Sequence, residues 1–121
     1  MIQASQPACT VYFDGGCPLC RREIAHYRAL PGADAIEWVD AAGSDPVELG
    51  PGLARDTALA RMHVRRKDGS LVSGAAAFAA LWSSMPQYAR LGRIASRPTV
   101  LAILEAGYRG FLLVRCIWRA P

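Results

Sequence analysis

A short apolar segment that runs into a glycine turn and then into a Cys-X-X-Cys motif constrains this chain most strongly. Residues 9–13 (Cys-Thr-Val-Tyr-Phe) are mainly β-branched and aromatic, which predicts a buried strand. Asp14-Gly15-Gly16 follows directly and indicates a tight turn. Pro18 fits the first position of a helix, where its missing N–H costs no hydrogen bond. We therefore expect a strand, a turn and then a helix over residues 18–30.

The rest of the chain continues this alternation of strands and helices. A second strand is expected at residues 36–40, and the order strand–helix–strand predicts a right-handed parallel crossover. Asp68-Gly69 is typical of a hairpin turn. The other expected elements are a loop at residues 41–52, a short helix at 53–61, hairpin strands at 62–66 and 71–73, and helices at 75–84, 87–95 and 98–119. One α/β domain over residues 1–121, with a central mixed sheet flanked by helices, accounts for this order.

The composition excludes a disordered chain, because 52% of the residues are hydrophobic and 20% are charged. The sequence contains no uninterrupted apolar stretch long enough for a transmembrane helix. Residues 1–7 have neither the basic nor the apolar region of a secretory signal. We therefore expect a cytoplasmic protein.

The charges are divided unevenly between the two halves of the chain. Residues 1–60 contain four Arg and eight acidic residues, a net charge of −4, whereas residues 61–121 contain nine Arg, one Lys and two acidic residues, a net charge of +8. The basic residues are spaced rather than clustered, so the sequence does not favour nucleic-acid binding. The expected helix at 98–119 combines apolar residues with Arg109, Arg115, Trp118 and Arg119. It either packs on the domain or contacts a membrane surface or a partner protein.

The spacing of Cys17 and Cys20 fits disulfide exchange, which needs one attacking thiolate and a second thiol close to it. If Pro18 is the first helical residue, Cys17 is the N-cap and its sulfur faces the free N–H groups of Leu19 and Cys20. A helix N-terminus lowers the pKa of a thiol. We therefore expect Cys17 to attack the substrate disulfide and Cys20, as the more buried thiol, to resolve the mixed disulfide. Cys9 is expected to be a small apolar core residue, and Cys116 to be partly exposed near the chain end.

Asp14 lies three residues before Cys17, and two roles are open for its carboxylate. It could accept the proton of Cys20 during resolution, directly or through water. Alternatively, it could cap the turn by accepting a hydrogen bond from the backbone N–H of Gly16 or Cys17.

Taken together, these residues resemble the signature of the DCC family of predicted thiol–disulfide oxidoreductases, which are named for one Asp and two Cys. The resemblance starts at residues 14–23 and extends over nearly the whole chain. The further matching segments are Trp38-Val39-Asp40, residues 58–64, Asp68-Gly69, Gly74, Leu81-Trp82 and Tyr108-Arg109. The resemblance implies a thioredoxin-like fold, a redox pair at Cys17 and Cys20, and Asp14 as the third signature residue.

The Cys17-Pro18-Leu19-Cys20 motif is also similar to the glutaredoxin Cys-Pro-aromatic-Cys turn, with leucine in place of the aromatic residue. Thioredoxins and glutaredoxins place a cis-proline just before the strand that faces the dithiol. The corresponding residues 60–63 contain no proline, and we expect Met62 or His63 to face the substrate there instead. Residues 73–76 are the only counterpart of the glutaredoxin element that holds glutathione, so the sequence does not indicate glutathione use.

The sequence therefore predicts a monomeric thiol–disulfide oxidoreductase that exchanges disulfides with a protein or a small thiol and needs no cofactor or metal. Its expected catalytic residues are Cys17, Cys20 and Asp14, on a turn formed with Gly15, Gly16 and Pro18. The alternative is a non-catalytic binding module whose cysteine pair is inactive or filled by a metal. Such a module would dock to a membrane surface or a partner through its basic C-terminal helix.

Overall fold

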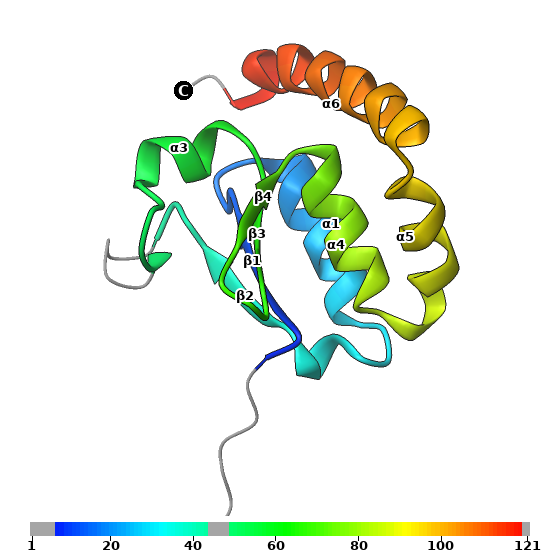
Figure 1. Ribbon diagram of the computed structural model, residues 1–121. Helices are drawn as coiled ribbons and strands as arrows, with labels where there is room; N and C mark the ends of the chain where they lie inside the picture. Colours follow the sequence, from blue (N-terminus) through cyan, green and yellow to red (C-terminus); the bar gives the residue numbers. More distant parts are fainter. Residues whose placement is uncertain (1–6, 44–48, 120–121) are drawn as a thin grey trace, which may run out of the picture.

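A mixed sheet of four strands organises the molecule, in the order β2-β1-β3-β4 (Figure 1). The computed structural model describes residues 7–43 and 49–119, with side chains up to residue 114. The strands are β1 (Cys9–Phe13), β2 (Glu37–Asp40), β3 (His63–Arg66) and β4 (Leu71–Ser73). β1 pairs in parallel with β2 and antiparallel with β3, and β3 forms a hairpin with β4. The predicted parallel crossover and the predicted hairpin are both confirmed.

The helices lie close to the positions that the sequence predicts. They are α1 (Pro18–Arg28), α3 (Arg55–Ala60), α4 (Ala75–Ser83), α5 (Ala89–Ala95) and α6 (Pro98–Arg119), with short 3₁₀ helices at Ala33–Ala35 and Pro86–Tyr88. The stretch expected as one helix over residues 87–95 is divided, because a 3₁₀ turn that starts at Pro86 precedes α5. Residues 44–48 of the expected loop lie outside the described residues.

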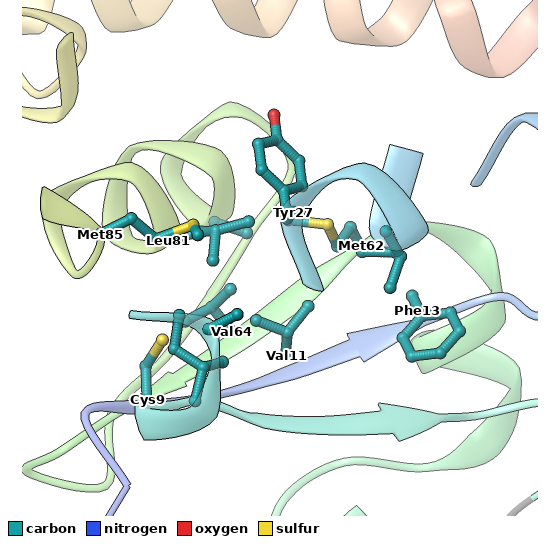
Figure 2. Close-up of a cluster of buried hydrophobic side chains, with 12 residues drawn as sticks. Cys9, Val11, Phe13, Tyr27, Met62, Val64, Leu81 and Met85 are labelled. Carbon is teal, nitrogen blue, oxygen red and sulfur yellow. The ribbon is translucent and has the colours of Figure 1, made fainter. Parts of the chain in front are cut away.

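One face of the sheet packs against α1 and α4 in the main hydrophobic core. Val11 and Val64 contribute from the sheet, Ile24 from α1, and Leu81 from α4. Figure 2 shows Val11 and Val64 facing Leu81 and Met85 across this core. Burial of these apolar side chains is the main term that fixes α1, and therefore its N-terminal end, against the sheet.

The opposite face of the sheet is covered by α3 and the segment that precedes it. Tyr12 packs there with Leu49, Leu53 and Ala58. The Arg65 guanidinium donates hydrogen bonds to the Tyr12 hydroxyl at 3.1 Å, to the Leu49 carbonyl at 3.1 Å and to the Pro51 carbonyl at 2.7 Å. Helical layers on both sides of a mixed sheet, joined by this strand order, make the fold thioredoxin-like.

The long helix α6 lies across the ends of α1 and α4 (Figure 1). Glu105 anchors it, because its carboxylate accepts hydrogen bonds from Arg61 at 2.5 Å, from Arg109 at 2.9 Å and from the Ala75 amide at 3.2 Å. Burial disfavours the charge of Glu105, but these hydrogen bonds outweigh burial and lower its pKa. The helix therefore packs on the domain, which is the first of the two alternatives that the sequence left open for residues 98–119.

The outer side of α6 carries exposed apolar residues, among them Ile103 and Leu113 at 67% and 75% exposure. Across residues 7–43 and 49–119, every helix is too short or too polar to cross a membrane.

Candidate active site

The turn that follows β1 is held by the side chain of Asp14. Asp14 is only 3% exposed, and its Oδ1 accepts a hydrogen bond from the Gly16 amide at 2.9 Å. The Asp14 carbonyl accepts a second hydrogen bond from the Cys17 amide at 3.1 Å. The turn-capping alternative for Asp14 is therefore present in the structure.

Asp40 holds the same turn from the neighbouring strand, a role that the sequence analysis did not assign to it. Its Oδ1 accepts hydrogen bonds from the Gly15 amide at 2.8 Å and from the Ala42 amide at 2.9 Å. A Cβ atom on Gly15 would overlap the Asp40 carboxylate, so this approach requires glycine. The only signal in the sequence is that Asp40 ends the expected strand at residues 36–40; its pairing with Phe13 comes from the structure.

Cys17 is the N-cap of α1, as predicted, and Pro18 occupies the first turn. The Cys17 Sγ accepts a hydrogen bond from the Cys20 amide at 3.4 Å. Cys17 and Cys20 lie 3.2 Å apart, and no disulfide joins them in this structure. The two thiols are therefore within reach of each other at the N-terminal end of a helix.

The exposure of the two thiols is the reverse of the prediction. Cys17 is 0% exposed, whereas Cys20 is half-buried. The N-cap position turns the Cys17 sulfur toward the backbone of α1. Cys20 lies one turn later and faces a cavity, which leaves part of its surface accessible. The prediction that Cys20 is the more buried thiol is therefore wrong.

This cavity has a volume of about 310 Å³ and lies between the sheet, α1, α4 and α6. Cys20 and Asp14 both line it, together with Met62 from the residue before β3. Tyr108 and Phe111 complete the lining from α6. The C-terminal helix therefore contributes directly to the surroundings of the dithiol.

Tyr108 also contacts Met62, the residue just before β3. In thioredoxins, the corresponding segment holds the cis-proline that faces the dithiol. The Met62 amide donates a hydrogen bond to the Tyr108 hydroxyl at 2.6 Å, and the Met62 carbonyl accepts one from Gly74 at 2.9 Å. Both backbone polar groups of Met62 are thus satisfied within the chain. Sequence reasoning missed this contact, since it joins residues 46 positions apart.

The structure brings Met62, but not His63, to the cavity. His63 lies beside Tyr12 on the sheet face that α3 covers, and its Nδ1 donates a hydrogen bond to the Arg61 carbonyl at 2.8 Å. Burial lowers the pKa of His63 from its ordinary value, against the opposing effect of this hydrogen bond.

The lowered pKa of His63 predicts a loss of stability in acid. The unfolded chain binds the proton more tightly, so the free energy of unfolding is highest above about pH 6.5 and falls as the pH drops below it. Urea unfolding at about pH 8 and about pH 5.5 measures this loss. His63→Gln should show a smaller loss than the parent protein. An unchanged loss in His63→Gln, or an equal reduction in the exposed-residue control His26→Gln, would contradict the assignment.

Removing the Tyr108 hydroxyl should destabilise the protein, because Tyr108→Phe leaves the buried Met62 amide without its acceptor. We expect the free energy of unfolding to fall by about 1–3 kcal/mol. Tyr88→Phe is the matched control, since the Tyr88 hydroxyl contacts His26 at an exposed position. Chemical denaturation of both variants measures the difference. Equal stability of the two variants would show that the Tyr108 bond contributes nothing.

Of the remaining candidate residues, Cys9 lies away from this site. Cys9 is buried in the main core (Figure 2), where burial raises the pKa of its thiol against a weaker opposing hydrogen bond from Ser84. The side chains of Cys116 and Trp118 lie outside the described residues. In the described part of the chain, no three His, Cys, Asp or Glu side chains gather in a way that could hold a metal ion.

Comparison with known proteins agrees with the geometry of this site. The model of the family described as DCC1-like thiol-disulfide oxidoreductase matches residues 11–120, which include the last three residues of β1, the dithiol turn and α6. No curated protein and no solved structure gives a significant match. The family match spans nearly the whole chain, and on that ground the protein belongs to the DCC1-like thiol-disulfide oxidoreductase family.

Proposed function

We propose that this protein is a thiol–disulfide oxidoreductase in which Cys17 and Cys20 alternate between two thiols and one disulfide. The observation that carries the proposal is the placement of both cysteines, which lie 3.2 Å apart, at the N-terminal end of α1. Membership of the family supports the same chemistry. Neither thiol needs a cofactor for this exchange, since the electrons pass between sulfur atoms.

The Cys17 sulfur lies at the N-terminal end of α1, where it is the N-cap. The Cys20 amide donates a hydrogen bond to Sγ, and the N-terminal end of a helix carries a partial positive charge. Arg21 and Arg22 add positive charge on the first turns of α1. A thiolate is the reactive form in disulfide exchange, so this arrangement suits a sulfur that leaves and returns during the cycle.

Asp14 acts in this proposal as a positioning residue. Its Oδ1 holds the Gly16 amide, and Asp40 holds the Gly15 amide from the other side. Pro18 starts the helix at the next position. The four residues Asp14, Gly15, Gly16 and Asp40 thus set where Cys17 sits at the end of α1. Asp14 also lines the cavity beside Cys20, and in this proposal its carboxylate has the second task of accepting the Cys20 proton during the exchange.

A stoichiometric exchange with bis(2-hydroxyethyl) disulfide tests this function. The reduced protein should release two molecules of 2-mercaptoethanol per chain while Cys17 and Cys20 become a disulfide. The control is the double variant Cys17→Ser/Cys20→Ser, which keeps Cys9 and Cys116 and should release only a background amount. Equal release from the parent and the double variant would refute the proposed function and favour the binding-module alternative.

A further inference from the structure

We propose that the cavity beside Cys20 is the substrate site and that it takes small, apolar disulfides and thiols, which exchange directly with Cys20. This inference rests on the proposed function and adds to it the class of substrate and the sulfur that the substrate meets. Three observations carry it: the chemistry of the cavity walls, the closed backbone at Met62 and the unequal exposure of the two thiols.

The walls of the cavity are mainly apolar and aromatic. Phe13 contributes from β1, Phe78 from α4, and Tyr108 and Phe111 from α6. The ring centroids of Phe78 and Tyr108 lie 5.8 Å apart, and those of Tyr108 and Phe111 lie 6.0 Å apart, so these rings form one continuous wall. The charged side chains of Arg22 and Glu23 also line the cavity, but both are exposed and therefore lie at its mouth.

The volume of about 310 Å³ is at the small end of the range for ligand pockets, which is roughly 300–1,000 Å³. A molecule with one or two rings or a short alkyl chain fits such a space. Its burial against aromatic walls is favourable because apolar surface leaves water.

The N–H and C=O groups of Met62, with which an extended peptide would pair, already form hydrogen bonds within the chain. A peptide that paired with Met62 would have to displace the Tyr108 hydroxyl from the amide and Gly74 from the carbonyl. Each displaced group would lose a hydrogen bond that the peptide must replace. This favours a substrate that is recognised by its apolar surface in the cavity over one that is recognised by its backbone.

Access decides which sulfur reacts with such a substrate. Cys20 lines the cavity, whereas Cys17 is fully buried. A disulfide R–S–S–R that enters the cavity is attacked by the Cys20 thiolate, which forms a mixed disulfide with one R–S group and releases the other as R–S⁻. The Cys17 thiolate then attacks the Cys20 sulfur, forms the Cys17–Cys20 disulfide and releases the second R–S⁻. The protein loses two electrons and two protons, and the substrate becomes two thiols.

The reverse direction follows the same path. A substrate thiolate attacks the Cys20 sulfur of the protein disulfide and expels Cys17, whose thiolate the Cys20 amide stabilises. A second substrate thiolate then releases R–S–S–R and leaves Cys20 reduced. Cys17 is the internal partner in both directions, which is the opposite of the assignment that the sequence alone favours.

The first part of the test compares an apolar disulfide, 2,2′-dipyridyl disulfide, with oxidised glutathione, which is polar and charged. Each rate is divided by the rate of the same disulfide with a peptide that contains Cys-Pro-Leu-Cys, which corrects for intrinsic reactivity. The protein should favour the apolar disulfide by about tenfold or more, because its ring leaves water when it enters the apolar cavity.

A charge placed in the cavity should remove this preference. Phe111→Glu introduces a carboxylate into the cavity wall, and the matched control Leu113→Glu introduces one on the exposed side of the same helix. If Phe111→Glu does not fold, competition on the parent protein replaces it: indole, an unreactive apolar probe, should slow the reaction with 2,2′-dipyridyl disulfide. Loss of the preference in Phe111→Glu alone, or competition by indole, supports the proposal.

The reacting sulfur is identified by mass spectrometry of the adducts with 2,2′-dipyridyl disulfide. Cys17→Ser should carry the thiopyridyl group on Cys20. Cys20→Ser should form an adduct on Cys17 at least tenfold more slowly than Cys17→Ser forms its adduct on Cys20. Faster labelling of Cys17, or equal normalised rates for both disulfides with no effect of indole, would overturn the proposal while leaving the proposed function in place. Failure of the parent protein to exchange with either disulfide would instead refute the function.

Discussion

Replacing Cys17 by serine is expected to stop the exchange after its first step while the fold stays intact. Serine is a good N-cap, so its Oγ can accept the hydrogen bond from the Cys20 amide that the Cys17 Sγ accepts now. The variant then keeps Cys20 but has no second thiol to attack the mixed disulfide. Bis(2-hydroxyethyl) disulfide should therefore release one 2-mercaptoethanol per chain rather than two, and a stable adduct should remain on Cys20.

Cys9→Ala is the matched control for this variant, because Cys9 is also a buried cysteine but lies in the main core away from the dithiol. It should release two thiols per chain as the parent protein does, with a loss of stability of only about 1 kcal/mol. Intact-mass measurement after acid quenching distinguishes the adduct from the protein disulfide, and a thiol assay of the solution counts the released 2-mercaptoethanol. Full release from Cys17→Ser, or loss of release in Cys9→Ala, would contradict the assignment of the redox pair.

Replacing Gly15 by alanine is expected to cause a large loss of stability, although it adds only one methyl group. The new Cβ would overlap the Asp40 carboxylate, which accepts hydrogen bonds from the Gly15 and Ala42 amides. Asp40 must then move, and the turn loses a hydrogen bond to a charged group. We expect the free energy of unfolding to fall by about 2–4 kcal/mol from the strain and the lost hydrogen bond together.

Gly43→Ala is the control for the added methyl group, because its Cβ would lie 4.0 Å from the same Asp40 carboxylate, an ordinary contact. Its stability should stay within about 0.5 kcal/mol of the parent protein. Urea unfolding of both variants measures the difference. If both variants are equally stable, the close approach of Gly15 to Asp40 does not hold the dithiol turn.

Local patterns in the sequence were sufficient to predict most of the elements and the N-cap. Residues 9–13 form β1 over the same bounds, because β-branched and aromatic residues precede a glycine turn. Pro98 starts α6 and Pro18 starts α1, since proline fits the first turn of a helix. The position of Cys17 as N-cap follows from Pro18 alone, and the mixed sheet follows from the strand–helix–strand order and the Asp68-Gly69 turn.

Features that depend on how distant segments meet could not be predicted. The exposure of Cys20 depends on a cavity whose walls come from four elements. The hydrogen bond from Met62 to Tyr108 depends on where α6 crosses the domain, and no periodic pattern encodes that crossing. The role of Asp40 needs the register of two parallel strands. His63 was predicted to face the substrate as readily as Met62, because the side of a strand on which a residue lies depends on its register with β1.

A redox titration of the full chain tests the central claim most directly. The protein is equilibrated across a series of glutathione redox ratios, its remaining thiols are alkylated, and the disulfides are mapped by mass spectrometry. The account predicts a reversible loss of two hydrogens that maps to Cys17–Cys20, with Cys9 in the thiol form throughout. Thiols at Cys17 and Cys20 that stay reduced across the whole series, or a disulfide that joins either of them to another cysteine, would contradict it.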